Sequence, residues 1–129
     1  MEKMYIFSTY QANKTLDENM KNHVALFEYL TKKDYRPIHV AGKYKDQHEE
    51  SILLMGPVEE YQDLVRGLAR EFNQESILEV QPHNKFKAVL YYLSSNKEEP
   101  IGIFTDVHPI RACQQNAYSI IEGKYYVVQ

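Results

Sequence analysis

The sequence has little material for covalent or metal cross-links. It contains a single cysteine, Cys113, among 129 residues, so it cannot form an internal disulfide, and no CxxC pair is available for zinc or redox chemistry. We interpret Cys113 as a small buried apolar residue, because no neighbouring motif indicates a reactive thiol. The five histidines are dispersed, and none forms a metal-ligating i,i+4 pair on a predicted helix. We therefore expect neither a metal nor a cofactor.

Long apolar runs, charge of one sign and standard catalytic motifs are also absent. No stretch approaches the ~20 apolar residues of a membrane-spanning helix, and the first ten residues lack the pattern of a signal peptide. The net charge is only −3, with basic residues scattered among acidic ones, so no basic stripe is available for nucleic acid. Phosphate-binding, nucleophile-elbow and zinc-protease signatures are missing too. We expect a cytoplasmic protein that binds neither nucleic acid nor membrane.

The residues that are present have the composition of an ordinary globular protein. Of the 129 residues, 43% are apolar and 26% are charged, which is close to the average for soluble domains. Because one domain usually takes roughly 150 residues, we expect residues 1–129 to form a single domain.

Apolar residues alternate between strand spacing and helix spacing. A capping box, Thr15 with Glu18, predicts a helix that runs to about Lys33. A second helix is expected to open at Gly56-Pro57, because proline suits a first helical turn. Its apolar stripe is Tyr61, Leu64, Val65, Leu68 and Phe72. Strands are predicted at 4–10, 37–41, 51–55, 76–80, 86–93, 101–107, 118–121 and 125–128. The polar stretch 42–50 is expected to be a turn or loop.

The order β-α-β-β-α-β followed by extra strands predicts an α+β fold. It is typical of the ferredoxin-like, split β-α-β arrangement, in which two helices cover one face of an antiparallel sheet. The other face would stay uncovered and carry alternate side chains, several of them tyrosines. Because large exposed apolar patches usually mark interfaces, this pattern predicts self-association, although it does not set the number of subunits.

One cluster of polar residues suggests chemistry. Glu49 and Glu50 stand directly before the apolar run 52–54, and Tyr44 lies a few residues upstream. Side chains of a strand alternate between its two faces, so one carboxylate of the pair faces the sheet surface and the other faces away. Such a carboxylate is either an ordinary solvated charge or the anchor of a cationic group, with Tyr44 supplying a hydroxyl or a π face. The pattern leaves both interpretations open.

Five short blocks of the sequence also form a larger pattern. The blocks are FSTYQAN (7–13) continuing to DENM (17–20) and His23, GKY (42–44) followed by Glu49 and Glu50, QESIL (74–78), GIFTDV (102–107), and YSI (118–120) with GKYYVVQ (123–129). Each block is weak by itself. Their order and spacing from Tyr5 to Gln129 resemble those of the phage S-adenosylmethionine lyases, long called S-adenosylmethionine hydrolases.

The resemblance implies a fold, an assembly and a reaction. It implies a ferredoxin-like subunit in a homotrimer similar to the PII regulatory proteins, with active sites between subunits. It further implies cleavage of S-adenosylmethionine to 5′-methylthioadenosine and homoserine lactone or homoserine. For a phage, this reaction would starve the restriction and methylation systems of the host. The alternative is a non-catalytic, trimeric PII-like protein that binds a nucleotide or a partner and regulates it.

The resemblance also suggests site residues. Glu50, the second glutamate of the pair, and Tyr44 match the family as catalytic residues, although the loop between them is shorter here than in the relatives. Glu50 would hold the α-ammonium of the substrate, while Tyr44 would hydrogen-bond to the substrate or face its sulfonium. Glu49 is the alternative to Glu50. The residues that we expect to bind substrate are Tyr10, Asn13, Gln74 and Glu49.

Overall fold

The eight strands form one closed antiparallel barrel. The computed structural model describes residues 1–129. The strands are β1 (Glu2–Phe7), β2 (Ile38–Tyr44), β3 (Gln47–Pro57), β4 (Ser76–Gln81), β5 (Lys87–Tyr92), β6 (Lys97–Val107), β7 (Tyr118–Ile121) and β8 (Lys124–Val128). They follow the order β1-β3-β2-β7-β8-β6-β5-β4, and β4 pairs back with β1 to close the barrel. The helices are α1 (Leu16–Lys32), α2 (Val58–Glu71) and the short α3 (Pro109–Cys113), with a 3-10 turn at Pro82–Asn84.

The prediction of an open ferredoxin-like sheet with two helices on one face is wrong, because the sheet closes on itself. The C-terminal hairpin joins its two ends: β7 pairs with β2, and β8 pairs with β6. The long β6 pairs first with β5 and then with β8. Near the end of the first part, where it pairs with Ala88, Gly102 has a φ of +136°, a conformation that glycine adopts most readily. The register of β5 and β6 also shifts beside Ala88 and Val89, and such bulges bend a sheet.

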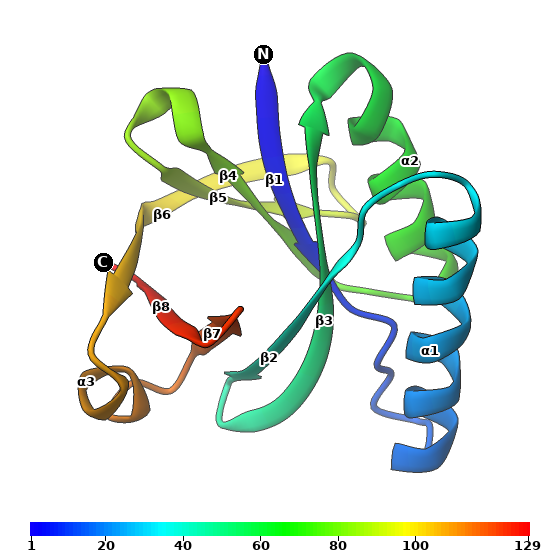
Figure 1. Ribbon diagram of the computed structural model, residues 1–129, viewed down its shortest axis with the longest axis horizontal. Coiled ribbons are helices and arrows are strands. Elements are labelled where there is room, and N and C mark those ends of the chain that lie inside the picture. Colours follow the sequence, from blue (N-terminus) through cyan, green and yellow to red (C-terminus); the bar gives the residue numbers. More distant parts are fainter.

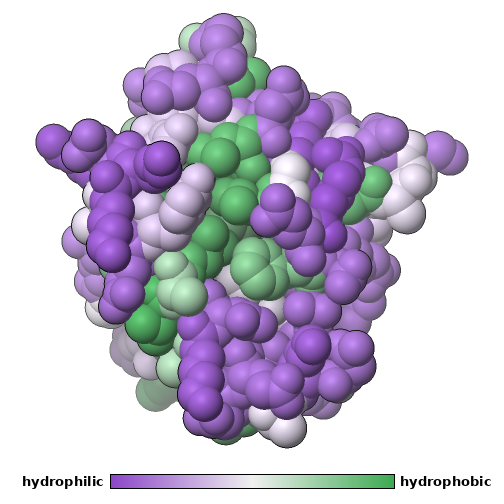
Figure 2. Space-filling view, turned by 90° about the vertical axis from the view of Figure 1, so that its right-hand side faces the viewer, coloured by the Kyte–Doolittle hydropathy of each residue, from purple (hydrophilic) through white to green (hydrophobic).

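Because the sheet closes into a barrel, the sheet face that was expected to be uncovered is not exposed to solvent as a flat surface. That face is the interior of the barrel, while α1 and α2 lie on one flank of the outside (Figure 1). The argument that an uncovered sheet face drives self-association therefore no longer holds. Exposed apolar side chains do occur at successive turns of α1, at Leu16, Met20 and Val24. On the helix-bearing side of the molecule, apolar side chains gather in a strip between polar ones (Figure 2).

Local predictions were more accurate than the global one. Both long helices and the two hairpins at 76–93 and 118–128 are confirmed. The capping box of α1 is formed, since the Glu18 backbone N–H donates to Thr15 Oγ1 at 3.1 Å. Pro57 is the N-cap of α2 rather than part of its first turn. The sequence did not predict α3, and its Cys113 is exposed rather than buried.

The expected loop at 42–50 is mostly strand. β2 and β3 pair through Tyr44 and Gln47, and only Lys45 and Asp46 form the turn. Both turn residues have positive φ, 51° and 62°, as the tight hairpin turn with matching twist requires. This stretch is polar because its side chains face solvent and an internal cavity, which composition alone does not distinguish from a loop.

The barrel wall separates two apolar clusters. Along β1 the side chains alternate, so that Tyr5 and Phe7 pack outward against the helices while Ile6 faces inward. The outer cluster also contains Leu26, Leu30, Ile52, Leu54, Val65, Ala69, Ile77, Tyr91 and Leu93. The inner cluster consists of Ile6, Val40, Leu53, Val80, Ala88, Phe104 and Ile121. None of the helices has the length and apolar character needed to cross a membrane.

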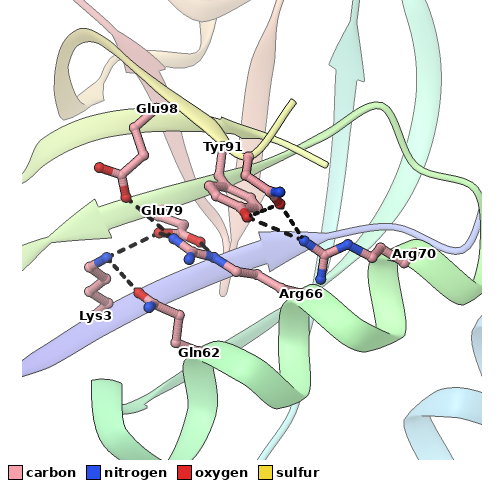
Figure 3. A network of polar contacts seen from close by, with 8 residues as sticks. Lys3, Gln62, Arg66, Arg70, Glu79, Tyr91 and Glu98 are labelled. Atoms are coloured by element: carbon pink, nitrogen blue, oxygen red, sulfur yellow. Dashed lines mark hydrogen bonds and ion pairs between the residues drawn. The ribbon is translucent and has the colours of Figure 1, made fainter. Parts of the chain in front are cut away.

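A buried ion-pair network fixes α2 on the outer face of the barrel (Figure 3). Glu79 of β4 is 0% exposed. It accepts two hydrogen bonds from the Arg66 guanidinium, each 3.0 Å, and one from the Lys3 ammonium at 3.1 Å. The Arg66 guanidinium also lies 3.6 Å from the centroid of the Tyr91 ring. Because each charge in this network has a partner of opposite sign, the desolvation of Glu79 is compensated.

Candidate active site

The barrel interior contains a cavity of about 750 Å³ that is open at one end. Three loops surround its mouth: Gln11 to Asn13, Asn73 to Glu75, and Gln115 to Ala117. The turn of the β2–β3 hairpin is tied to the third loop, because the Asp46 N–H donates to the Asn116 carbonyl at 3.1 Å. The hairpin and α3 lie at the lower end of the molecule in Figure 1. The volume is within the roughly 300–1,000 Å³ of small-molecule sites.

The opposite end of the barrel is filled. Ile6, Val40 and Phe104 of the inner cluster form part of the cavity wall. The other members of this cluster do not line the cavity and occupy the barrel beyond it; they are Leu53, Val80, Ala88 and Ile121. Side chains normally fill the interior of an eight-stranded barrel. The cavity is therefore blind, with a polar mouth and an apolar inner end.

Glu49 and Glu50 lie on opposite faces of β3. Glu49 lines the cavity. Glu50 is on the outer face, where its carboxylate contacts the Nε2 atoms of His39 and His48 at 2.5 Å and 2.9 Å. Its side chain is 15% exposed. Each imidazole meets a different carboxylate oxygen, and no group of three or more such side chains is arranged to share a metal ion. The expectation of a metal-free site stays a prediction.

Glu49 is a carboxylate without a cationic partner. Burial raises its pKa, and a hydrogen bond from Ser8 opposes this shift. The Ser8 hydroxyl also donates to the Glu50 backbone carbonyl at 2.8 Å, and its single hydrogen cannot serve both acceptors at once. No lysine, arginine or histidine forms an ion pair with Glu49. The cavity thus carries a negative charge that the chain does not neutralise, and this charge suits a cationic ligand.

The other candidate residues surround the same cavity. Tyr10, Asn13, Gln74 and Tyr44 all line it, whereas Glu50 does not. The Gln74 Nε2 donates to the Tyr10 carbonyl at 2.6 Å, so this amide holds the first loop in place. The Tyr10 hydroxyl contacts the Met20 sulfur of α1, and burial, followed by Glu50 and Glu49, raises its pKa. Tyr44 is 38% exposed at the mouth, with the Lys45 ammonium 5.4 Å from its ring centroid.

Sequence reasoning missed several wall residues. The Lys43 ammonium lies 5.6 Å from the Tyr118 ring centroid and 3.7 Å from the Asp46 carboxylate. Ser51 and Ser119 also line the cavity. One signal was present in the GKY block: a Cβ at Gly42 would lie 2.5 Å from the Tyr118 carbonyl oxygen. A glycine is needed where β2 meets β7, but its partner strand cannot be read from the sequence.

Comparison with known proteins identifies a family. The profile of the S-adenosylmethionine lyase family matches residues 5–129, nearly the whole chain. A search of curated proteins finds no match. The matched range includes every wall and rim residue named above.

Proposed function

The chain belongs to the S-adenosylmethionine lyase family, and from this premise we propose that it cleaves S-adenosylmethionine to 5′-methylthioadenosine and homoserine lactone inside the barrel cavity. As a member of this family it is an S-adenosylmethionine lyase. The observation that carries the proposal is the Glu49 carboxylate, which faces the cavity without a cation of the chain. S-Adenosylmethionine supplies two cationic groups, a sulfonium and an α-ammonium.

The substrate contains both reacting groups. Its carboxylate oxygen attacks the γ-carbon, the bond between this carbon and sulfur breaks, and the electron pair stays on sulfur. The products are neutral methylthioadenosine and a lactone that keeps the α-ammonium, so charge balances and no proton moves. The protein must bring the oxygen to about 3–3.5 Å from the γ-carbon, and such positioning can lower a barrier by roughly 7–11 kcal/mol.

The cavity favours this step in two ways. A partly dehydrated cavity lowers the barrier for the reaction of the carboxylate with the sulfonium-bearing carbon chain. The reason is that water stabilises the separated charges of the substrate more than the charge-diffuse transition state. Glu49 would hold the α-ammonium and curl the methionine arm. Of the two glutamates it is the better candidate for this anchor, since the Glu50 carboxylate is engaged by His39 and His48 on the outer face. Tyr44 at the mouth would face the sulfonium or hydrogen-bond to the carboxylate end.

An isotope experiment tests the reaction and its route together. The purified protein is incubated with S-adenosylmethionine in ¹⁸O-water without additives, and the products are separated and analysed by mass spectrometry. The proposal expects methylthioadenosine in excess over protein and unlabelled lactone, with label entering only the carboxyl group when the lactone later opens. Label in the homoserine hydroxyl would mean that water attacks the γ-carbon, which contradicts the intramolecular route. No methylthioadenosine would contradict the activity itself.

The setting of the activity is also a proposal. The protein would work as a homotrimer in the bacterial cytoplasm and deplete S-adenosylmethionine as a phage counter-defence against restriction. The exposed apolar stripe of α1, Leu16, Met20 and Val24, supports self-association. Light scattering measures the mass, with a trimer expected and a monomer contradicting it. Expression in a restricting host should lower cellular S-adenosylmethionine and raise the plating of unmodified phage.

A further inference from the structure

The inward side chains of β3 mark successive depths of the cavity. Of the β3 residues that line the cavity, Glu49 is nearest the hairpin turn at the mouth, and Ser51 is the next inward residue. The following inward residue, Leu53, belongs to the inner cluster beyond it. Successive inward positions of a strand are about 7 Å apart. A ligand that reaches past Glu49 therefore meets the Ser51 hydroxyl and then a closed apolar end.

Polarity changes along the same direction. The mouth carries the charge of Glu49 and the amides of the three loops, whereas Leu78, Leu90 and Phe104 line the inner part. Removing a charged group from water costs far more than removing a neutral polar ring. S-Adenosylmethionine has a zwitterionic amino acid at one end and a neutral heteroaromatic base at the other. The base therefore fits the inner end and the amino acid fits the mouth.

The cavity wall also has hydroxyl groups that can bind the base. The Ser51 hydroxyl lines the cavity one inward position deeper than Glu49, and the Ser119 hydroxyl lines it at the level of Glu49, because both Glu49 and Ser119 pair with Gly42. They stand on different strands, β3 and β7. A hydroxyl both donates and accepts, so it suits the ring nitrogens and the amino group of adenine. A buried polar group gains most from a partner where water is scarce.

We propose that S-adenosylmethionine enters the blind cavity adenine first, so that the lactone leaves first and methylthioadenosine leaves last. This inference rests on the proposed function. Because the cavity has a single mouth, the deeper product cannot pass the shallower one. Methylthioadenosine then binds the free enzyme and competes with the substrate. The site is regulated by its own nucleoside product, and related 5′-thioether nucleosides should occupy it in the same way.

Product inhibition of the unmodified protein tests this order. The expected result is competitive inhibition by methylthioadenosine and noncompetitive inhibition by homoserine lactone, each against S-adenosylmethionine. Competitive inhibition by the lactone together with noncompetitive inhibition by methylthioadenosine would overturn the orientation. Competitive inhibition by both products would overturn it as well. Turnover of S-adenosylmethionine in the same assay tests the proposed function separately, since a protein can turn over with either pattern.

Two substitutions at neighbouring inward positions of β3 test the orientation by binding alone. Ser51→Val removes the inner hydroxyl and should weaken methylthioadenosine binding about tenfold in calorimetry. Glu49→Gln should leave that affinity unchanged, because methylthioadenosine carries no ammonium. Equal losses in both variants, or a loss only in Glu49→Gln, would overturn the proposal. Ser51→Ala, checked by thermal unfolding, replaces Ser51→Val if the larger side chain prevents folding.

Discussion

Two carboxylates on opposite faces of the barrel wall have contrasting surroundings. Glu79, under α2, receives hydrogen bonds from Arg66 and Lys3 and has no exposed surface. Glu49, inside the barrel, has no cationic partner, and burial raises its pKa. Folding alone therefore supplies the cationic partners of Glu79, whereas Glu49 gains a cationic partner only when a ligand enters the cavity. The first carboxylate serves stability, and the second is available for a ligand.

The largest expected effect concerns Glu79. Glu79→Ala leaves the partly buried Arg66 and Lys3 charges with only Glu98 and Gln62 as acceptors, and breaking a buried pair in this way costs about 3–5 kcal/mol. Urea unfolding should show a loss of this size in the free energy of unfolding. Turnover per folded molecule should stay near that of the unchanged protein. A loss of turnover in fully folded Glu79→Ala would mean that the outer network also serves the site.

Glu49→Gln should have the opposite profile. It keeps the shape of the side chain but removes the anchor of the α-ammonium, and a misplaced methionine arm should lower turnover about 100-fold. The folded protein should be no less stable, because burial disfavours the charged form of Glu49 and the amide carries no charge. Methylthioadenosine formation and thermal unfolding measure the two effects.

Glu50→Gln is the matched control for this substitution. The two glutamates are adjacent in sequence, but Glu50 faces outward to His39 and His48. Its amide variant should therefore keep turnover within a few-fold of the unchanged protein. If Glu50→Gln abolishes turnover while Glu49→Gln retains it, the catalytic role of Glu50 that the family resemblance implies is correct, and the reaction takes place outside the cavity.

The ionisation of Glu49 should make both kcat/KM and stability depend on pH. Only the ionised Glu49 can hold an ammonium, and its pKa is raised by burial, so kcat/KM should fall on acidification at a higher pH than an ordinary glutamate would give. Stability follows the reverse trend. The folded state binds the Glu49 proton more tightly than the unfolded state does, so this group's contribution to stability falls as pH rises from the unfolded pKa to the folded pKa.

A pH series on two proteins isolates this group. The profile of kcat/KM is compared between the unchanged protein and Glu49→Gln. The acidic limb should be present in the first and absent in the residual activity of the second. The same limb in both proteins would assign it to another group. Above the folded pKa of Glu49 its unfavourable contribution to stability is fully present, which is the reason that Glu49→Gln should not destabilise the protein there.

The sequence revealed local structure better than closure. Thr15 and Glu18 fix the start of α1 through contacts three residues apart, and the hairpin at 118–128 depends on neighbouring segments. Closure depends on β2 meeting β7, about 80 residues away along the chain. Gly42 allows this meeting, and Gly102 allows the close approach of Gln129 to β6, but a glycine in a strand does not specify the strand that approaches it.

The same limit applies to the site. Alternation along a strand predicted that Glu49 and Glu50 face opposite ways. It could not tell which face becomes the interior, because that face exists only after the distant β7 and β8 close the barrel. Tyr10, Asn13 and Gln74 were found in family blocks and do line the cavity. The Ser51 hydroxyl carried no signal, since serine is common in any strand or turn, whereas Ser119 lies within the YSI block.

The smallest expected effect is that of Tyr44→Phe. Tyr44 is partly exposed at the mouth, and the nearby Lys45 ammonium lies against its ring, 5.4 Å from the centroid. The ring can therefore face a cation, and such an interaction at an exposed site is worth about 0.5–1 kcal/mol. Phenylalanine keeps the ring, so turnover should change less than about threefold, whereas Tyr44→Leu should raise KM more than it lowers kcat. A large fall in kcat for Tyr44→Phe would instead assign the hydroxyl to the reacting carboxylate, and Glu49 would then not position the substrate alone.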